Sequence, residues 1–470
     1  MLNKVTHQSK ISILQGKSLV AYYKQMLFIL GISLVLCLLN ACQQTVNTAY
    51  EAEVNQADYL HRSMKKLTDV IVHDIFSPPV ASRIYTYPSI AAYEVLQQDS
   101  SDFVSIASQL NGLGEVPQPN ANKTYCFPLA SVHAFLTVGK ALIFSEDKIA
   151  AFQEQIYTEM KAKGIPQKVY ANSMDYGDAV AKHVLAWADK DNYKQTRTFP
   201  KFSINDELER WQPTPPDYME GIEPHWSKIR PFVIDSATQF VPAPPTAFSL
   251  DKKSPFYTEV MEVYETVNKL DSNQTEIAKF WDCNPYVSHH RGHVMYATKK
   301  ITPGGHWVGI TAISCKKAKA DLMQSAASYA TVTLALADGF ISCWDEKYRS
   351  NLVRPETYIN QHIDTEWQPL LQTPPFPEYT SGHSVISTAA ATILTKLYGE
   401  PFQFVDTTEV EYGLPPRTFN SFYEASAEAA VSRLYGGIHY MPAIEDGVAQ
   451  GKKVGNFIAQ KVVTNTVIGH

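Results

Sequence analysis

Residues 376–384 read FPEYTSGHS, and an apolar run from Val385 to Leu397 follows them. The prolines before the triplet Ser381-Gly382-His383 disfavour a helix, whereas the alanine- and leucine-containing run after Gly382 can form one. We therefore expect a helix to begin at this triplet, with unpaired backbone N–H groups in its first turn. Such a helix end carries roughly half a positive charge and attracts anions.

The triplet combines three properties that suit an anion site. Ser381 can donate an O–H, Gly382 allows close approach of the backbone, and His383 can move a proton. The alternative interpretation of the same residues is an ordinary N-cap serine followed by a surface histidine.

Composition bounds the class of protein. The chain has 470 residues, of which 45% are hydrophobic and 19% charged, which suits a folded chain of one large or two ordinary domains. The net charge of −6 and the pI of about 6.2 argue against a nucleic-acid-binding protein, since such proteins normally carry a basic face.

The N-terminus has the features of a targeting segment. Lysines stand at positions 4, 10, 17 and 24, and no acidic residue precedes Cys42. The apolar run from Met26 to Leu39 is shorter than a typical transmembrane helix. It ends in Leu39-Asn40-Ala41-Cys42, which resembles a bacterial lipobox and implies lipidation of Cys42. We therefore expect a lipid-anchored protein of the bacterial cell envelope, on an outer membrane and facing the periplasm or the exterior; a plain signal peptide is the alternative.

The remainder of the chain shows helical periodicity and no alternating strand pattern of useful length, which predicts an all-α architecture of packed helices with long ordered loops. We expect a helix near 80–97 interrupted by Pro88, and a long helical region over 306–344 broken near Gly339. The predicted segments are a signal peptide and lipobox (1–42), a tether (43–56), a helical region (57–190), a proline- and aromatic-rich connection (191–250) and a second helical domain (251–470).

Cysteines and scattered histidines give weaker signals. No CxxC pair occurs, so a zinc ribbon is disfavoured. Outside the cytoplasm, one or two disulfides and buried free thiols are both open for Cys126, Cys283, Cys315 and Cys343. The segment HHRGH at 289–293 is interpreted as a solvated basic loop, and His306 as a structural histidine near the start of a helix.

Two further clusters carry cationic groups. Lys347 and Arg354 are seven residues apart, so we expect them on one face of a helix that Pro355 ends. Arg433 is followed by Gly436-Gly437 and then His439, and we expect the glycine pair to turn His439 back towards Arg433.

Together with the triplet, these clusters supply two arginines, a lysine, a serine, a helix N-terminus and two histidines. Arginine binds oxyanion oxygens in a fixed fork and lysine adds a point charge. The set therefore suits an oxyanion with several negative oxygens, with one histidine bonding its central atom and the other exchanging a proton.

The order and internal spacing of these motifs resemble a known superfamily. KYRSNLVRP at 347–355, TSGH at 380–383 and SRLYGGIH at 432–439 are similar to the motifs of vanadium-dependent haloperoxidases and type 2 phosphatidic-acid phosphatases. One departure is Thr380, where the family usually has proline. The resemblance implies the helical-bundle fold of that superfamily for residues 251–470.

The resemblance also implies roles for individual residues. Contacts with the oxyanion would come from Lys347, Arg354, Arg433, Ser381 and the N–H of Gly382. His383 would be the acid–base group, and Lys347 would also polarise peroxide. His439 would bind vanadium in a haloperoxidase or attack phosphorus in a phosphatase.

Three residues favour the haloperoxidase branch by resemblance. Trp344 precedes Lys347 by three residues, as in fungal-type chloroperoxidases, and Phe376 stands where chloroperoxidases have phenylalanine. Asp282, after Phe280-Trp281, resembles a carboxylate that orients the second arginine. Aromatic residues beside a pocket are also common as plain core packing.

The resemblance therefore implies a vanadate-dependent haloperoxidase, which oxidises halide with hydrogen peroxide to a hypohalous acid. One alternative is an envelope phosphatase without a cofactor, acting on phosphomonoesters or lipid phosphates through a phosphohistidine. A second is an oxyanion-binding lipoprotein without turnover.

Overall fold

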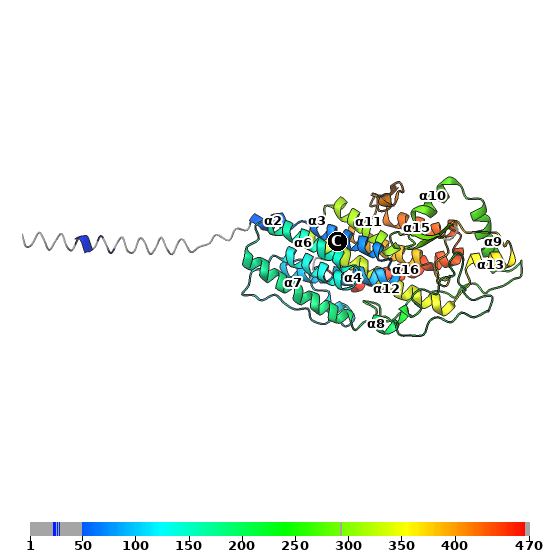
Figure 1. Cartoon of the computed structure of the whole chain (residues 1–470), viewed down its shortest axis with the longest axis horizontal. Helices are drawn as coiled ribbons and strands as arrows, with labels where there is room; N and C mark the ends of the chain where they lie inside the picture. Colours follow the sequence, from blue (N-terminus) through cyan, green and yellow to red (C-terminus); the bar gives the residue numbers. More distant parts are fainter. Residues whose placement is uncertain (1–21, 25, 27, 29–48, 292–293, 466–470) are drawn as a thin grey trace, which may run out of the picture. The chain divides into compact units, whose positions relative to one another are not determined.

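The structure is a computed structural model that describes residues 22–24, 26, 28, 49–291 and 294–465, and one compact unit begins at Glu51 (Figure 1). Helices dominate this unit, which confirms the predicted all-α class. The predicted lipobox at residues 39–42 lies outside the described residues. Up to residue 250 the elements are α2 (Ala49–Val54), α3 (Ala57–His73), α4 (Pro78–Leu96), η1 (Gln97–Asp99), η2 (Ala107–Gln109), α5 (Phe127–Ala141), α6 (Glu146–Lys161), α7 (Gln167–Ala188), α8 (Tyr193–Thr196) and η3 (Trp226–Lys228).

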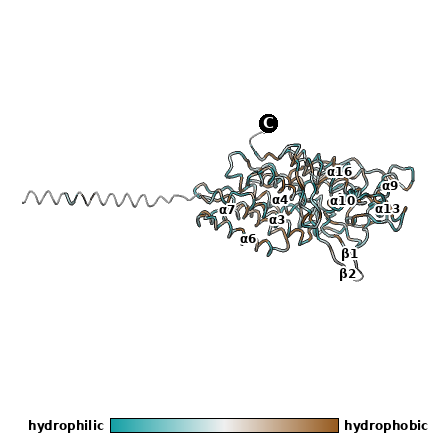
Figure 2. Tube along the Cα trace, turned by 90° about the horizontal axis from the view of Figure 1, so that it is seen from above, coloured by the Kyte–Doolittle hydropathy of each residue, from teal (hydrophilic) through white to brown (hydrophobic). Residues whose placement is uncertain are grey.

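The second half contains the helices that carry the predicted site. Its elements are α9 (Pro255–Asn268), α10 (Ser272–Phe280), β1 (Val287–Arg291), β2 (Val294–Thr298), α11 (Pro303–Ala318), α12 (Leu322–Ser350), α13 (Pro355–His362), α14 (Gly382–Tyr398), β3 (Phe404–Asp406), η4 (Val410–Tyr412), β4 (Arg417–Phe419), α15 (Phe422–Tyr435) and α16 (Met441–Lys461). Within the unit, α6 and α7 lie at one end and α9 and α13 at the other (Figures 1 and 2).

The strands that the structure describes form two small antiparallel hairpins. β1 pairs with β2 in the register Val287↔Thr298, and β3 pairs with β4 in the register Phe404↔Phe419. The expectation that residues 289–293 form a loop is therefore wrong for the backbone of His289 and His290, because a partner strand pairs with them. Their side chains, and His293, lie outside the described residues. Figure 2 shows this hairpin extending away from the helices.

Helix α4 joins the two halves of the unit, because it packs against α5, α7 and α12. Pro78 occupies its first turn, where a missing N–H has no cost. The predicted interruption at Pro88 is wrong, since α4 runs through this proline. All of its residues are buried, so packing on several sides offsets the hydrogen bond that the proline removes.

Helix α12 is the core of the second half. It is long and apolar enough to cross a membrane by length and composition, but the apolar window is completely buried, as in the core helix of a globular protein. The predicted break near Gly339 is wrong, because this glycine lies inside α12 and faces Val385 and Ile386 of α14. The break falls earlier, where Lys319 adopts φ 55° and Asp321 caps α12.

The segment 191–250 contains only α8 and η3 among its helices, but it is held firmly to the core. The buried carboxylate of Asp338 on α12 accepts hydrogen bonds from the backbone N–H groups of Phe232, Val233 and Ile234 at 2.7–2.9 Å. These bonds explain how an aromatic-rich connection without periodicity stays ordered.

Helices α14 and α16 approach each other unusually closely. A Cβ atom added to Gly451 would lie 2.2 Å from the carbonyl oxygen of Val385, so only glycine fits there. The Ser381 N–H donates to the carbonyl of Ala443 at 2.9 Å. This close packing fixes the start of α14, which carries the triplet.

The four cysteines that the structure describes, Cys126, Cys283, Cys315 and Cys343, are free and buried. Of the two possibilities that the sequence leaves open, the structure therefore shows free thiols.

Candidate active site

The triplet Ser381-Gly382-His383 lies at the N-terminus of α14, as predicted. Ser381 is the N-cap, and its Oγ accepts a hydrogen bond from the Ser384 N–H at 3.4 Å. Its hydroxyl proton remains able to donate elsewhere. The N-cap interpretation and the anion-site interpretation are therefore compatible, since capping uses only the lone pairs of the serine.

Lys347 and Arg354 do not share a helix, so that part of the prediction is wrong. Helix α12 ends at Ser350, because Asn351 adopts a left-handed conformation with φ 50°, which asparagine tolerates well. Pro355 then begins α13 instead of ending α12, and Arg354 is the residue just before it. Both cationic side chains are nevertheless fully buried.

Three hydrogen bonds fix the guanidinium of Arg354. Its Nε donates to the carbonyl of Phe376 at 2.9 Å, and Nη1 contacts the Ile438 carbonyl at 2.8 Å and His439 Nε2 at 3.2 Å. Among the described residues, Nη2 has no hydrogen-bond partner. Burial lowers the pKa of Arg354 to about 10, so the guanidinium is still charged at neutral pH.

Arg433, in the last turn of α15, also has one guanidinium nitrogen that is hydrogen-bonded to a backbone carbonyl and another that is not bonded. Its Nη1 donates to the Trp281 carbonyl at 2.9 Å, whereas Nε has no partner within the part of the chain that the structure describes. Beyond the end of α15, Gly437 adopts φ 76° and redirects the chain, as predicted for the glycine pair. His439 follows two residues later.

His439 is held in one tautomer by Glu378. The Oε1 atom of Glu378 accepts from the Tyr440 N–H at 3.0 Å, so it acts as an acceptor, and His439 Nδ1–H donates to the same oxygen at 2.8 Å. The lone pair of His439 is therefore on Nε2. Burial, followed by the charge of Arg354, holds the pKa of His439 well below its usual range, which leaves a neutral imidazole.

Glu378 is a site residue that the sequence analysis missed. It is fully buried, and burial raises its pKa to about 7. One signal was available: it is the only carboxylate in the stretch FPEYTSGHS.

Lys347 does not present a free donor. Its Nζ donates to the backbone carbonyls of Pro377, Glu378 and Thr380 at 3.0, 3.0 and 2.6 Å, which uses all three hydrogens of the ammonium. Burial lowers the pKa of Lys347 to about 7. For Lys347 to contact an oxyanion, its ammonium must therefore give up the hydrogen bond to one of these three carbonyls.

A cavity of about 290 Å³ reaches part of this site, although Lys347, Arg354, Glu378 and Ser381 are not among the residues that line it. Gly382, His383, Arg433 and His439 line it, together with mostly apolar and aromatic side chains. His383 Nε2 is buried and has no partner among the residues described, and burial, followed by the charge of Arg433, holds the pKa of His383 well below its usual range. A neutral imidazole in this position can accept a proton.

The three residues assigned by weaker resemblance fall near this cavity. Trp344 and Phe376 both line it, and the Phe376 ring lies 5.0 Å from the Lys347 Nζ and from the Arg354 Cζ. Asp282 is buried and accepts from Lys300 Nζ at 2.7 Å. Burial lowers the pKa of Arg433, and the charge of Asp282 offsets part of this effect. The hydrogen bond that orients Arg433, however, goes to the carbonyl of Trp281, the residue before Asp282.

The residues fit an oxyanion bonded through its central atom. Two guanidiniums have buried donors without partners in the described structure. The Nε2 lone pair of a neutral His439 accepts from Arg354 Nη1 at 3.2 Å, so Nε2 can bond a central atom once this hydrogen bond is released. Vanadate needs this combination, because imidazole nitrogen suits the metal and arginine suits its oxygens.

A family model described as the VCPO second helical-bundle domain matches residues 327–466. A bacterial vanadium-dependent iodoperoxidase is 51% identical, with a TM-score of 0.84, and the match covers 88% of this chain and 99% of that one. No match was found among the curated proteins.

Two more distant structures support the fold alone. A holo-type bacterial vanadium-dependent chloroperoxidase is 16% identical with a TM-score of 0.63, covering 83% of this chain and 93% of that one. The apo-type form gives 15% identity and a TM-score of 0.61, with 82% and 95% covered. The identity and coverage of the iodoperoxidase match show that the chain belongs to the vanadium-dependent haloperoxidases, enzymes that oxidise halide at a vanadate cofactor.

Proposed function

We propose that this enzyme oxidises iodide with hydrogen peroxide and holds its vanadate on His439. The halide is proposed because the 51% identical protein is an iodoperoxidase and its match covers almost that entire chain. The observation that carries the site assignment is the Glu378–His439 pair, which directs the Nε2 lone pair of a neutral imidazole towards Arg354. When bound, vanadate supplies a Lewis acid that activates peroxide towards halide.

The oxyanion cradle would consist of charged side chains and one helix end. Arg354 and Arg433 contribute the guanidinium nitrogens that lack partners among the described residues. Ser381 contributes its hydroxyl proton, and Gly382 contributes a backbone N–H in the first turn of α14. These donors are preorganised, so they stabilise negative oxygens with little rearrangement.

Proton movement is assigned to His383. Its Nε2 lies in the cavity and is neutral, so it can accept the proton that hydrogen peroxide loses on entering the site. The resulting imidazolium can return that proton to the oxygen that leaves with the halogen.

Lys347 is proposed to act in two ways. Its ammonium fixes the carbonyls of Pro377, Glu378 and Thr380, in the segment that leads directly into the Ser381 N-cap. When an oxyanion is present, exchange of one carbonyl would direct this charge towards the reacting oxygens.

A halide series on metal-free and vanadate-loaded protein tests this proposal. We expect oxidation only after vanadate loading, with kcat/KM highest for iodide. A higher kcat/KM for bromide or chloride would contradict the assigned halide. Turnover of a chromogenic phosphomonoester, blocked by vanadate and without halide oxidation, would instead support the phosphatase alternative.

We also propose that Cys42 is lipidated and anchors the enzyme to a bacterial envelope membrane, on the basis of the segment Leu39-Asn40-Ala41-Cys42. Cys42→Ser should then release the protein into the soluble fraction, whereas the neighbouring control Cys37→Ser should not. Unchanged membrane recovery of Cys42→Ser would contradict the anchor.

A further inference from the structure

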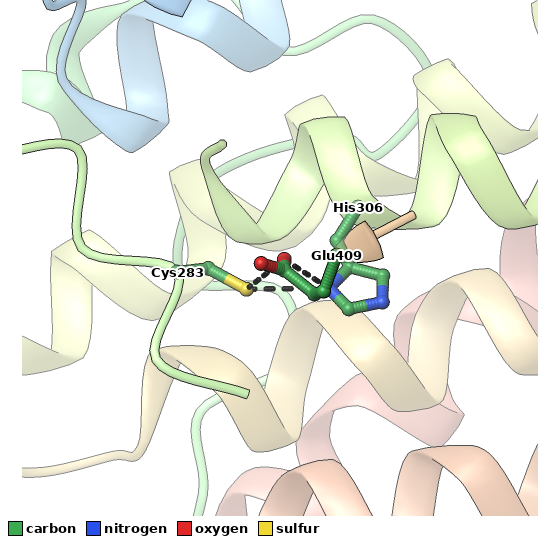
Figure 3. Close-up of side chains that lie close together, drawn as sticks. All are labelled: Cys283, His306 and Glu409. Carbon is green, nitrogen blue, oxygen red and sulfur yellow. Dashed lines mark hydrogen bonds and ion pairs between the residues drawn. The ribbon is translucent and has the colours of Figure 1, made fainter. Parts of the chain in front are cut away.

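A second group of metal-ligating side chains lies beside the active-site cavity. It consists of Cys283, His306 and Glu409, which Figure 3 shows converging from three separate segments. Cys283 follows α10, His306 is in the first turn of α11, and Glu409 precedes η4. The three residues are 1%, 0% and 1% exposed.

The ligand atoms have the spacing of three corners of a tetrahedral zinc site. Cys283 Sγ lies 3.4 Å from His306 Nδ1 and 4.0 Å from Glu409 Oε1, and Nδ1 lies 3.2 Å from Oε1. Zinc bonds of about 2.3 Å to sulfur and about 2.0–2.1 Å to nitrogen and oxygen place such atoms about 3.3–3.6 Å apart. Shifts of a few tenths of an ångström would therefore complete the geometry.

The other nitrogen of the His306 ring is already oriented for metal binding. Its Nε2 contacts Asp406 Oδ2 at 2.7 Å, and the second oxygen of Asp406 accepts from the backbone and hydroxyl of Thr408 at 2.9 and 2.6 Å. Metal-binding histidines typically donate their second N–H to a carboxylate in this way. With Nε2–H facing Asp406, Nδ1 points its lone pair between the sulfur and Glu409.

We propose that Cys283, His306 and Glu409 bind a zinc ion, with the fourth tetrahedral position taken by water. The mixed sulfur, nitrogen and oxygen set suits zinc better than calcium or magnesium, which prefer oxygen alone. The proposal is independent of the halide and of vanadate.

The ligand charges also suit a divalent ion. Cys283 would bind zinc as a thiolate, and the Glu409 carboxylate lies 3.2 Å from His306 Nδ1, so two negative ligand charges would offset the two positive charges of the ion.

The ion would stabilise one wall of the oxyanion pocket. The imidazole of His306 stacks on Trp281, with ring centroids 4.5 Å apart, and the Trp281 carbonyl accepts the hydrogen bond of Arg433. Cys283 lies two residues after Trp281 and itself lines the cavity. Zinc would therefore fix the loop that positions Arg433 against α11 and the segment before η4.

Elemental analysis and cobalt substitution of the purified protein test the site. We expect about one zinc per chain in protein purified without chelators. Replacement of zinc by cobalt should give a thiolate-to-cobalt charge-transfer band in the near ultraviolet. Cys283→Ser should remove this band, whereas Cys315→Ser, at another buried thiol, should retain it.

The proposal would be overturned by wild-type protein that takes up no zinc after incubation with the metal, or by a charge-transfer band that survives in Cys283→Ser. If Cys283→Ser does not fold, the zinc content and the cobalt spectrum of the wild-type protein test the proposal by themselves. A cobalt protein without a thiolate band, or a melting temperature unaffected by zinc removal and return, contradicts the site.

Discussion

Glu378 offers the sharpest test of how the site is built, because one of its oxygens serves two donors. Replacement by alanine removes the acceptor of His439 Nδ1–H at 2.8 Å and of the Tyr440 N–H at 3.0 Å. Replacement by glutamine keeps an amide oxygen in the same place. The amide nitrogen then takes the position of Glu378 Oε2, an atom that has no hydrogen-bond partner among the described residues.

The expected magnitudes follow from these contacts. A buried donor left without an acceptor costs about 1–3 kcal/mol, so the free energy of unfolding of Glu378→Ala should fall by about 2–6 kcal/mol. Loss of a partner that orients a metal ligand typically weakens metal binding by about 10–100-fold. We expect that loss of vanadate affinity for Glu378→Ala, whereas Glu378→Gln should stay within about tenfold of wild type.

The comparison between the two variants separates orientation from charge. Both remove the same ionisable carboxyl group beside an anion site, and loss of its negative charge above pH 7 would by itself strengthen vanadate binding. Vanadate titration of metal-free protein, followed by tryptophan fluorescence and by recovery of halide oxidation, gives the affinity. Urea unfolding gives the stability. Equal vanadate affinity in Glu378→Ala and Glu378→Gln would refute the argument that Glu378 acts by fixing the His439 tautomer.

Three other predictions concern Lys347, the helix contact and Arg433. The pKa of Lys347 is about 7 in the free protein, and a bound anion raises it, so vanadate binding should be tightest below that pH and weaken by up to about tenfold per pH unit above it. In Lys347→Met, the fall of vanadate affinity above a pH of about 7 should vanish. An unchanged slope of affinity against pH in this variant would contradict the role assigned to Lys347. Gly451→Ala should lower the free energy of unfolding in urea by about 1–3 kcal/mol or more, since its Cβ meets the Val385 carbonyl at 2.2 Å. The control Gly339→Ala, whose Cβ has contacts of 3.8–4.0 Å, should be neutral or stabilising by up to about 1 kcal/mol, and equal losses would count against the close packing. Arg433→Lys should bind vanadate about 10–100-fold more weakly, because one ammonium cannot reproduce the planar fork that bonds the Trp281 carbonyl and the anion together; wild-type affinity would show that Arg433 is not a ligand of the oxyanion.

Local signals were sufficient for the start of α14. The N-cap preference of Ser381 and the apolar run behind it depend only on neighbouring residues, and the structure confirms the helix start that they predict. The turn after Arg433 was also predictable, because Gly437 needs a positive φ.

Other features depend on distant partners and were therefore hidden. Pro88 is tolerated because α4 is packed on several sides, and Gly339 stays helical inside a buried α12. The end of α12 was misplaced because Asn351 adopts a left-handed conformation that periodicity does not reveal.

The groups that pair across the fold were the hardest to see. Glu378 meets His439 across 61 residues of sequence, and the cluster at His306 brings together side chains from three segments. Spacing within one motif cannot report such pairs, because only tertiary packing creates them.

Loading of metal-free protein with orthovanadate tests the central claim most directly. Bound vanadium is counted by elemental analysis while iodide oxidation with peroxide is followed. We predict that activity rises with bound vanadium and saturates at about one per chain, as for a single catalytic metal. His439→Ala should stay near zero in both measures, and the exposed control His362→Ala should match wild type. Halide oxidation without vanadium, or full loading and activity in His439→Ala, would contradict the account.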